Sequence, residues 1–260
     1  MNPDPTCEAY CAERVWTRAA SSQAVLMALF GFTVFCSAFL LFHVQLVIAK
    51  YILPWFGGTP ATFTTCILFF QVFLLFGYSY AYLIDVRLKP RSQAVVHSVL
   101  IILAIALLVF RFSTWGSPLL PDASWKPVDS EHPLARIIAL LFASVALPYF
   151  LISTTGPLLQ AWYARLPYRL YALSNTGSLI ALLSYPGVIE PLLSLRTQAQ
   201  VWASGFLLFG TGCIAIAWRA AGEQPAARCQ SSKLKRAART VRNRHGTQAD
   251  MAAPCRNRIP

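Results

Sequence analysis

Long uncharged apolar stretches follow one another along the chain, separated by short polar breaks, up to about residue 218. A helix of roughly 20 apolar residues crosses a hydrocarbon core about 30 Å thick, and six of the stretches reach that length. Inside lipid the backbone must satisfy its own hydrogen bonds, which favours helices, and the alternating pattern of a membrane β-barrel is absent. The sequence therefore predicts an all-α, polytopic helical membrane protein with spans at about 24–48, 61–84, 93–112, 134–153, 168–186 and 198–218.

An alternative for the first stretch is a cleavable signal peptide, because Arg14 and Arg18 precede it. Its apolar part, 24–49, is much longer than the ~7–15 residues of a signal core. This length favours an uncleaved first span.

Composition divides the chain into an N-terminal arm (1–23), a six-helix transmembrane domain (24–218) and a basic C-terminal tail (219–260). Hydrophobic residues make up 56 % of the chain and charged residues only 12 %. The tail contains ten Lys or Arg residues and two acids, so it contributes +8 of the net charge of +12. Its low aliphatic content predicts disorder, and its charge favours contact with anionic lipid. We expect no nucleic-acid binding, because the tail has no fold or aromatic platform for it.

Basic residues near the span ends predict the orientation, because cytoplasmic loops are enriched in Lys and Arg. With the N-terminus inside, the outer side receives five of these residues: Lys50, Arg111, Lys126, Arg136 and Arg196. The cytoplasmic side receives eight: Arg14, Arg18, Arg87, Lys89, Arg91, Arg165, Arg169 and Arg219. Both termini are therefore expected to be cytoplasmic.

The remaining connections follow the same layout. The segment 113–133 is proline-rich and contains three acids, which predicts an exposed loop. All seven tryptophans fall in loops, in the arm or near span ends. Because amphipathic rings prefer the headgroup region, none is expected at the membrane midplane.

Four polar side chains at membrane depth are candidates for binding a substrate: His43, Gln45, Gln71 and Asn175. Intramembrane polar groups are functional candidates because burying them in lipid is costly. The alternative for each is a structural hydrogen bond between helices, typically contributing about 0.6–2 kcal/mol. His97 lies near a predicted span boundary and is expected to contact water.

Small residues in the fifth span recur at spacings of three and four, which places them on one helix face. These residues are Ser174, Gly177, Ser178 and Ala181. We expect them to allow the close approach of another helix.

Two short segments echo each other: "LPWFGGTP" at 53–60 and "LPYFLISTTGP" at 147–157. Both combine Leu-Pro-aromatic-Phe with a Gly/Pro break, after the first and fourth spans, so they predict two inverted three-helix repeats. The alternative is that prolines and aromatics simply gather at span ends. The hinge or signature residues of this hypothesis are Pro54, Trp55, Gly57, Gly58, Pro60, Pro148, Gly156 and Pro157.

No motif for catalysis, metal binding or a cofactor is present. The chain has no HExxH, GxSxG, P-loop or strand-flanked GxGxxG pattern. The seven cysteines have neither zinc spacing nor an even count. The sequence therefore predicts no catalytic residue, metal or cofactor.

Two long motifs resemble a known family. They are "FHVQLVIAKYILPWFGGTPATFTTCILFFQVFLLFGYSYAYL" (42–83) and "LPYFLISTTGPLLQAWYARLPYRLYALSNTGSLIALLSYP" (147–186). Together they resemble the membrane region of bacterial fused MFS/spermidine synthases, over about residues 24–218. Longer members of that family carry more helices and a cytoplasmic aminopropyltransferase-like domain with a Rossmann-like pocket. The tail after Trp218 departs from this pattern, so the resemblance implies a membrane module of the bacterial inner membrane without synthase activity.

Three functional hypotheses follow. The first is a transporter-like, MFS-like module for a small solute, in which six helices would need a homodimer or a second helical half in the lipid bilayer. The second is a non-catalytic membrane scaffold for an aminopropyltransferase-like partner. The third is a truncated fragment of a fused protein, with a natural short form as its alternative.

Overall fold

The structure, a computed structural model, describes residues 5–126, 132–162 and 167–222. All regular secondary structure in these ranges is helical, and six helices are long and apolar enough to cross a membrane. This confirms the predicted fold class: the chain is a multi-pass helical membrane protein. The helices are α1 (Pro5–Phe56), α2 (Pro60–Arg87), α3 (Pro90–Trp115), α4 (Pro133–Trp162), the stretch Tyr168–Leu192 and the helix Leu195–Gly222.

The fifth membrane helix has three parts: α5 (Pro167–Ser184), the π-helical turn η2 (Tyr185–Ile189) and the short α6 (Glu190–Leu192). Pro186 lies at the start of the π-helical turn. Because proline has no backbone N–H, it interrupts the regular hydrogen-bond ladder of the helix at this point. The helix nevertheless continues through the turn to Leu192.

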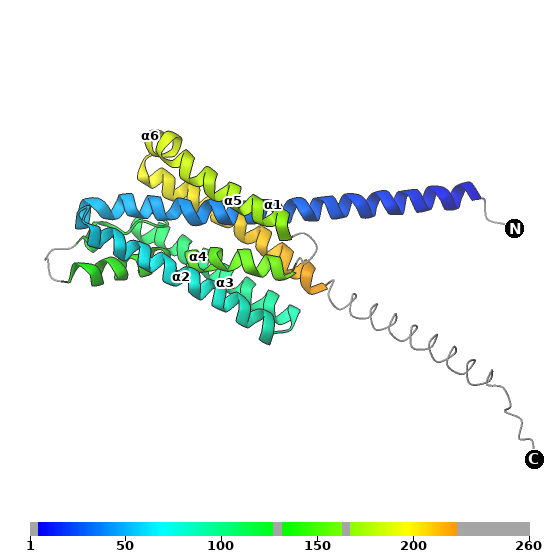
Figure 1. The fold of residues 1–260 in the computed structure, drawn as a ribbon, viewed down its shortest axis with the longest axis horizontal. Helices are drawn as coiled ribbons and strands as arrows, with labels where there is room; N and C mark the ends of the chain where they lie inside the picture. The colour runs from blue at the N-terminus through cyan, green and yellow to red at the C-terminus, as the bar shows by residue number, and fades with distance from the viewer. Residues whose placement is uncertain (1–4, 127–131, 163–166, 223–260) are drawn as a thin grey trace, which may run out of the picture.

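Consecutive helices run in alternating directions along one axis (Figure 1). Among the labelled helices, α1 packs mainly against α5, α2 packs mainly against α4, and α1 and α4 contact each other. The helix Leu195–Gly222 also packs against α1, at Gly205 and Gly212. The main hydrophobic core surrounds α1 and α4 and contains Val44, Ile48, Leu141 and Tyr149. Because the number of spans is even, α1 enters the bundle and Leu195–Gly222 leaves it at the same end (Figure 1).

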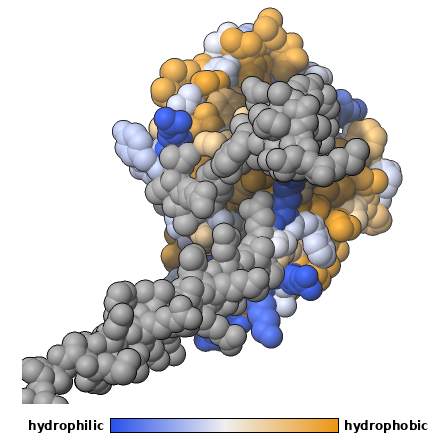
Figure 2. All heavy atoms as spheres, turned by 90° about the vertical axis from the view of Figure 1, so that its right-hand side faces the viewer, coloured by the Kyte–Doolittle hydropathy of each residue, from blue (hydrophilic) through white to orange (hydrophobic). Residues whose placement is uncertain are grey.

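The outer surface of the bundle is largely apolar. Leu68, Leu75 and Phe110 are each at least 60 % exposed, an apolar exposure that is normal toward lipid and unusual on a soluble monomer. Viewed toward the end where α2 meets α3, orange apolar side chains cover much of the visible surface, with hydrophilic ones scattered among them (Figure 2).

The predicted Gly/Pro break at 147–157 is wrong, because α4 continues from Pro133 to Trp162 with Pro148 and Pro157 inside it. A proline removes one backbone donor, and a membrane helix tolerates this loss when a neighbouring group satisfies the freed carbonyl. Pro148 frees the carbonyl of Ser144, four residues earlier, and Arg111 Nη1 donates a hydrogen bond to that oxygen. The segment 53–60 does contain a turn: α1 ends at Phe56 and Gly57 has a φ of 77°.

Two other turns are built alike. After α2, Gln93 Nε2 donates to the carbonyls of Ile84 and Leu88, at 3.3 and 3.0 Å. Gln198 repeats this arrangement after α6, 105 positions later (198 minus 93). The acceptors of Gln198 Nε2 are the carbonyls of Ile189 and Leu193, at 3.4 and 2.9 Å. The two turns lie at opposite ends of the bundle (Figure 1), as expected for two three-helix sets that run in opposite directions.

Several residues expected at the surface are buried. Within the predicted exposed loop, Leu119 and Leu120 pack into the main core, and the Pro121 carbonyl accepts a hydrogen bond from Tyr51 Oη. His97 is fully buried instead of wet. Trp202 is 1 % exposed, and its indole N–H donates to the carbonyl of Leu40, in the membrane-spanning part of α1.

The two terminal regions are only partly described. α1 begins at Pro5, so a helix runs through most of the predicted arm. The last helix extends to Gly222, and the predicted disorder of the tail from residue 223 onward lies outside the described residues.

Candidate functional site

The four candidate polar residues do not form one site. Gln71 in α2 and Asn175 in α5 are exposed on the outside of the bundle. His43 is 2 % exposed and lies in the interior. Gln45 is half-buried, and its Nε2 donates to Tyr149 Oη at 3.2 Å, which joins α1 to α4.

A small pocket with hydroxyl groups in its wall lies where α1, α2, α4 and α5 meet. Its volume is about 140 Å³, room for a few water molecules or a very small solute. The apolar part of its wall is Ala38, Leu41, Phe42, Leu74, Ile152 and Gly156. The hydroxyls come from Ser37, Tyr78, Ser153, Ser174 and Ser178, and we call this space the hydroxyl pocket.

Glycines bring the helices around the hydroxyl pocket close together. A Cβ on Gly77 in α2 would lie 1.8 Å from Ser153 Oγ in α4. A Cβ on Gly177 in α5 would lie 2.7 Å from the Phe35 carbonyl oxygen in α1. Gly156, by contrast, has no atom of the described residues within 4 Å of its ideal Cβ position, apart from its chain neighbours and the adjoining backbone of its own helix. Glycine therefore allows close helix contacts at positions 77 and 177, and at position 156 it leaves open space in the wall of the pocket.

The hydrogen bonds of the pocket serines determine what a ligand can meet. Three hydroxyls donate within their own helices: Ser37 Oγ to the Val34 carbonyl (2.8 Å), Ser153 Oγ to Phe150 (2.7 Å) and Ser178 Oγ to Ser174 (3.1 Å). Because a hydroxyl has one donor and two lone pairs, these oxygens retain acceptor capacity. Hydrogen-bond acceptors therefore predominate in the pocket, a property that suits a ligand with N–H or O–H groups.

Among the described residues, no carboxylate lines the hydroxyl pocket. A full positive charge would have no ion-pair partner there, and unpaired charges are costly to bury. The wall therefore fits a neutral polar solute better than a polycation.

Gln71 and Asn175 extend this polar surface to the outside of the bundle. Gln71 precedes Tyr78 by seven residues, or two helical turns, so both side chains lie on one face of α2. Asn175 is three residues before Ser178 and shares its face of α5. Lipid tails cannot hydrogen-bond to exposed amides, which favours a protein surface opposite them.

The predicted packing face of the fifth span has two parts. Gly177 and Ala181 are buried in the structure, and Gly177 approaches α1. Ser174 and Ser178 instead line the hydroxyl pocket.

His43 lies in an aromatic setting outside the hydroxyl pocket. Its ring is 5.6 Å from those of both Phe39 and Tyr185, measured between centroids. Neither ring nitrogen has a hydrogen-bond partner among the described residues. Tyr185 opens the π-helical turn, and such turns often occur at functional sites.

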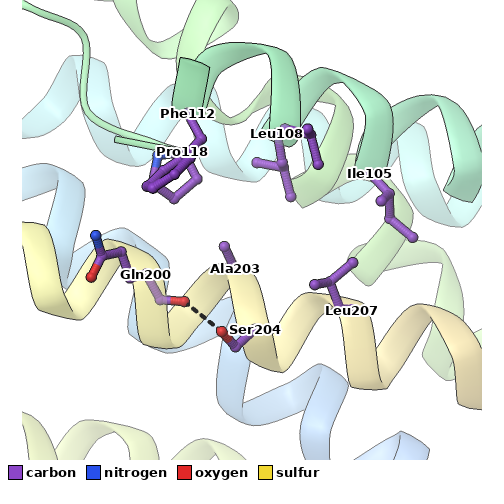
Figure 3. A pocket seen from close by; sticks show the side chains of 9 residues that line it. Ile105, Leu108, Phe112, Pro118, Gln200, Ala203, Ser204 and Leu207 are labelled. Atoms are coloured by element: carbon purple, nitrogen blue, oxygen red, sulfur yellow. Dashed lines mark hydrogen bonds between the residues drawn. The ribbon is translucent and has the colours of Figure 1, made fainter. Parts of the chain in front are cut away.

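A larger cavity of about 340 Å³ lies between α3 and the helix Leu195–Gly222. Side chains from the two helices face each other across it, among them Ile105, Leu108 and Leu207 (Figure 3). Its polar residues are Gln200 and Ser204, and Ser204 Oγ donates to the Gln200 carbonyl at 3.0 Å. The mainly apolar wall suits a hydrocarbon chain better than a polar solute.

No family model, curated protein or solved structure matches this chain. The resemblance to fused MFS/spermidine synthases therefore stays a prediction. Among the described residues, no group of three His, Cys, Asp or Glu side chains is placed to hold a metal ion.

Sequence reasoning missed the residues that line the hydroxyl pocket on α1, α2 and α4. Ser37, Tyr78 and Ser153 are polar residues inside long apolar stretches, as Gln71 and Asn175 are. Serine and tyrosine are common at membrane depth, however, and only the packing of four helices brings these three to one wall. The signal in the sequence was a hydroxyl residue near the same depth in each of the four spans that form the pocket.

Proposed function

We propose that this chain is a transporter-like, MFS-like membrane module that binds a small polar solute in the hydroxyl pocket. The main support is the position of the pocket, where four helices from both halves of the chain meet. The alike turns at Gln93 and Gln198 add support, since inverted three-helix sets are typical of transporter folds. In such folds the solute site lies near the midplane, between the two repeats.

The module needs a second protein body opposite the pocket. Six helices rarely enclose a complete transport pathway, and the polar amides of Gln71 and Asn175 are exposed on the outside. A homodimer or a second helical half would cover them. Cysteine introduced at Asn175 is expected to form a crosslink between two copies if the body is a homodimer. If the crosslink is absent and the chain is monomeric in lipid, a different chain supplies the second half.

The proposed location is the bacterial inner membrane, with both termini cytoplasmic. The excess of basic residues on the N-terminal side and the even number of spans support this orientation. Reporter tags at the two ends should report the same compartment, and opposite compartments would contradict the orientation.

A scaffold for an aminopropyltransferase-like protein is the second candidate function. The observation that favours it is the exposed basic turn between α2 and α3, which contains Arg87, Lys89 and Arg91. Such a turn could bind an acidic surface on the proposed cytoplasmic side. Loss of co-purification when all three residues are replaced by glutamine would support the scaffold.

Transport is tested with the purified full chain in proteoliposomes and a panel of labelled amines, polyols and small amides. Ser178→Ala and Ser204→Ala form a matched pair, because each serine donates to the carbonyl four residues earlier and only Ser178 lines the hydroxyl pocket. One lost hydrogen bond of about 1 kcal/mol lowers affinity about fivefold. Ser178→Ala and Tyr78→Phe should therefore reduce uptake, and Ser204→Ala should not.

Two results would refute transport through this pocket. One is background flux of every solute in the wild-type protein. The other is equal uptake by Ser178→Ala and Ser204→Ala, both folded, for a solute that the wild type does transport.

A further inference from the structure

A second cavity, of about 350 Å³, lies among α2, α3 and α4 and has a cation in its wall. Apolar side chains line most of it: Phe73, Leu107, Phe142, Leu147 and Phe150. The exception is Arg111, four residues before the end of α3. We call this space the Arg111 groove.

The Arg111 side chain is held firmly in place. It is 5 % exposed, and its Nη1 donates to the Ser144 carbonyl that Pro148 leaves without a helical partner. Its Cζ lies 5.5 Å from the centroid of the Trp115 ring, a favourable cation–π position. The guanidinium is therefore fixed in orientation before any ligand arrives.

Arg111 has no carboxylate partner among the described residues, in which the single ion pair joins Lys50 and Glu190. A guanidinium has five N–H donors, and the structure gives Arg111 one hydrogen bond, to Ser144. Ser144 Oγ is buried nearby and has no partner in the described part of the chain, so it does not accept a second hydrogen bond from Arg111. A buried cation with spare donors is costly unless an anion pairs with it.

We propose that the Arg111 groove binds an anionic phospholipid, with the phosphate on Arg111 and an acyl chain along α4. The lining runs from Phe142 to Phe150, eight residues or about 12 Å of helix. Arg111 adjoins the Phe142 end through its bond to Ser144, which leaves the apolar remainder for hydrocarbon. Arginine matches phosphate geometry with two parallel hydrogen bonds, and an apolar wall excludes a small hydrophilic anion.

The test is native mass spectrometry of the purified full chain with phosphatidylglycerol or phosphatidylcholine of identical acyl chains. Wild type should retain phosphatidylglycerol at least about tenfold better, since hydrogen bonds to charged groups are the stronger ones. Arg111→Gln should lose the preference, and Arg111→Lys should keep part of it. A folded Arg111→Gln protein with unchanged preference would overturn the proposal.

A second variant keeps the test decisive if Arg111→Gln does not fold. Ala143 is half-buried in the groove wall, so Ala143→Phe should fill the space and release phosphatidylglycerol while Arg111 stays. Retention of the lipid by this variant would refute the acyl-chain position.

Competing ligands and counter-ions are separate arms of the same experiment. Inorganic phosphate should not displace the lipid, and displacement by phosphate alone would mean an anion site without a lipid. Equal retention of a free fatty acid and of phosphatidylglycerol would show that the groove binds a carboxylate ligand and not specifically a phospholipid. Asp129 and Glu131 lie outside the described residues. If wild type shows no preference for phosphatidylglycerol and a preference appears only when both acids are replaced by amides, the counter-ion is assigned to them and the proposal is overturned.

Discussion

The contact between α2 and α4 at Gly77 gives a sharp prediction about stability. A Cβ at this position would lie 1.8 Å from Ser153 Oγ and 2.9 Å from Ser153 Cβ. Normal carbon–carbon contacts lie at about 3.5–4.0 Å, so Gly77→Ala must move one helix or the other. The substitution should destabilise the bundle and disturb the hydroxyl pocket, because Ser153 and the neighbouring Tyr78 both line it.

The loss of stability depends on which atoms can move to relieve the clash with Ser153. A new rotamer of Ser153 relieves the clash with Oγ, but it gives up the hydrogen bond to the Phe150 carbonyl at 2.7 Å, which contributes about 1 kcal/mol. Ser153 Cβ cannot rotate away, so α2 and α4 must also separate by several tenths of an ångström. Overpacking of this kind costs about 1–3 kcal/mol. We expect Gly77→Ala to lower the free energy of unfolding by about 2–4 kcal/mol.

Gly156→Ala is the matched control, since it also adds a methyl group to a helical glycine of this region. In the described part of the chain, no atom lies within 4 Å of that methyl position apart from chain neighbours and adjoining backbone of the same helix, and alanine favours helix over glycine by up to about 1 kcal/mol. The assay is reversible unfolding in mixed micelles with increasing dodecyl sulfate, followed by tryptophan fluorescence. The control should unfold at the same or a higher dodecyl sulfate fraction than wild type.

A double variant shows whether the clash is the cause. Gly77→Ala combined with Ser153→Gly removes both close side-chain atoms and should recover much of the lost stability. Such coupling is expected between residues in direct contact. If Gly77→Ala and Gly156→Ala unfold at the same dodecyl sulfate fraction, the close packing of α2 on α4 is refuted. A double variant that is no more stable than Gly77→Ala would refute it as well.

Four other substitutions test three separate parts of the fold. Gln93→Leu and Gln198→Leu should each cost about 1–2 kcal/mol in the same unfolding assay, because each removes the side-chain donor to a helix-end carbonyl, that of Leu88 or Leu193. Gln93→Leu should cost more, because Gln93 Oε1 also accepts from Trp162 Nε1 at 2.7 Å, whereas Gln198 Oε1 has no partner among the described residues; a larger loss for Gln198→Leu would contradict these contacts. Trp202→Phe should cost about 1 kcal/mol or more, because the indole N–H loses a buried acceptor in α1; no change in the assay would show that this bond is not formed. Lys50→Ala should change stability by less than about 1 kcal/mol and in a salt-dependent way, because its 2.8 Å bridge to Glu190 is partly exposed; a larger, salt-independent loss would contradict a surface pair.

The sequence was sufficient to predict the number and order of the membrane helices. Length and apolar content decide whether a segment spans a membrane, and both are local properties. Helix ends were predicted less well: the first span was expected to end at 48, and α1 continues to Phe56 through Lys50 and Pro54. Hydropathy places the end of a span at the first charged residue after the apolar stretch. The helix itself ends where the backbone changes direction, which here is at Gly57.

The interior polar contacts could not be predicted, because they depend on which helices are neighbours. Arg111 was expected at the outer surface, as befits a basic residue near a span end. It is buried because Pro148, 37 positions later (148 minus 111), frees a carbonyl on the adjacent helix. No local pattern connects these two residues.

The exposed and buried faces of the bundle support one conclusion about its assembly. α4 is the most enclosed span: 67 % of the residues in its most apolar part are buried, against 28 % for α2 and 17 % for the fifth span. The two least enclosed spans are also those that flank the hydroxyl pocket with Gln71 and Asn175. A face that only met lipid would gain nothing from amides, since lipid leaves their hydrogen bonds unmade. The low burial and the polar residues coincide on α2 and α5, so this face is where the second body of the proposed transporter would bind.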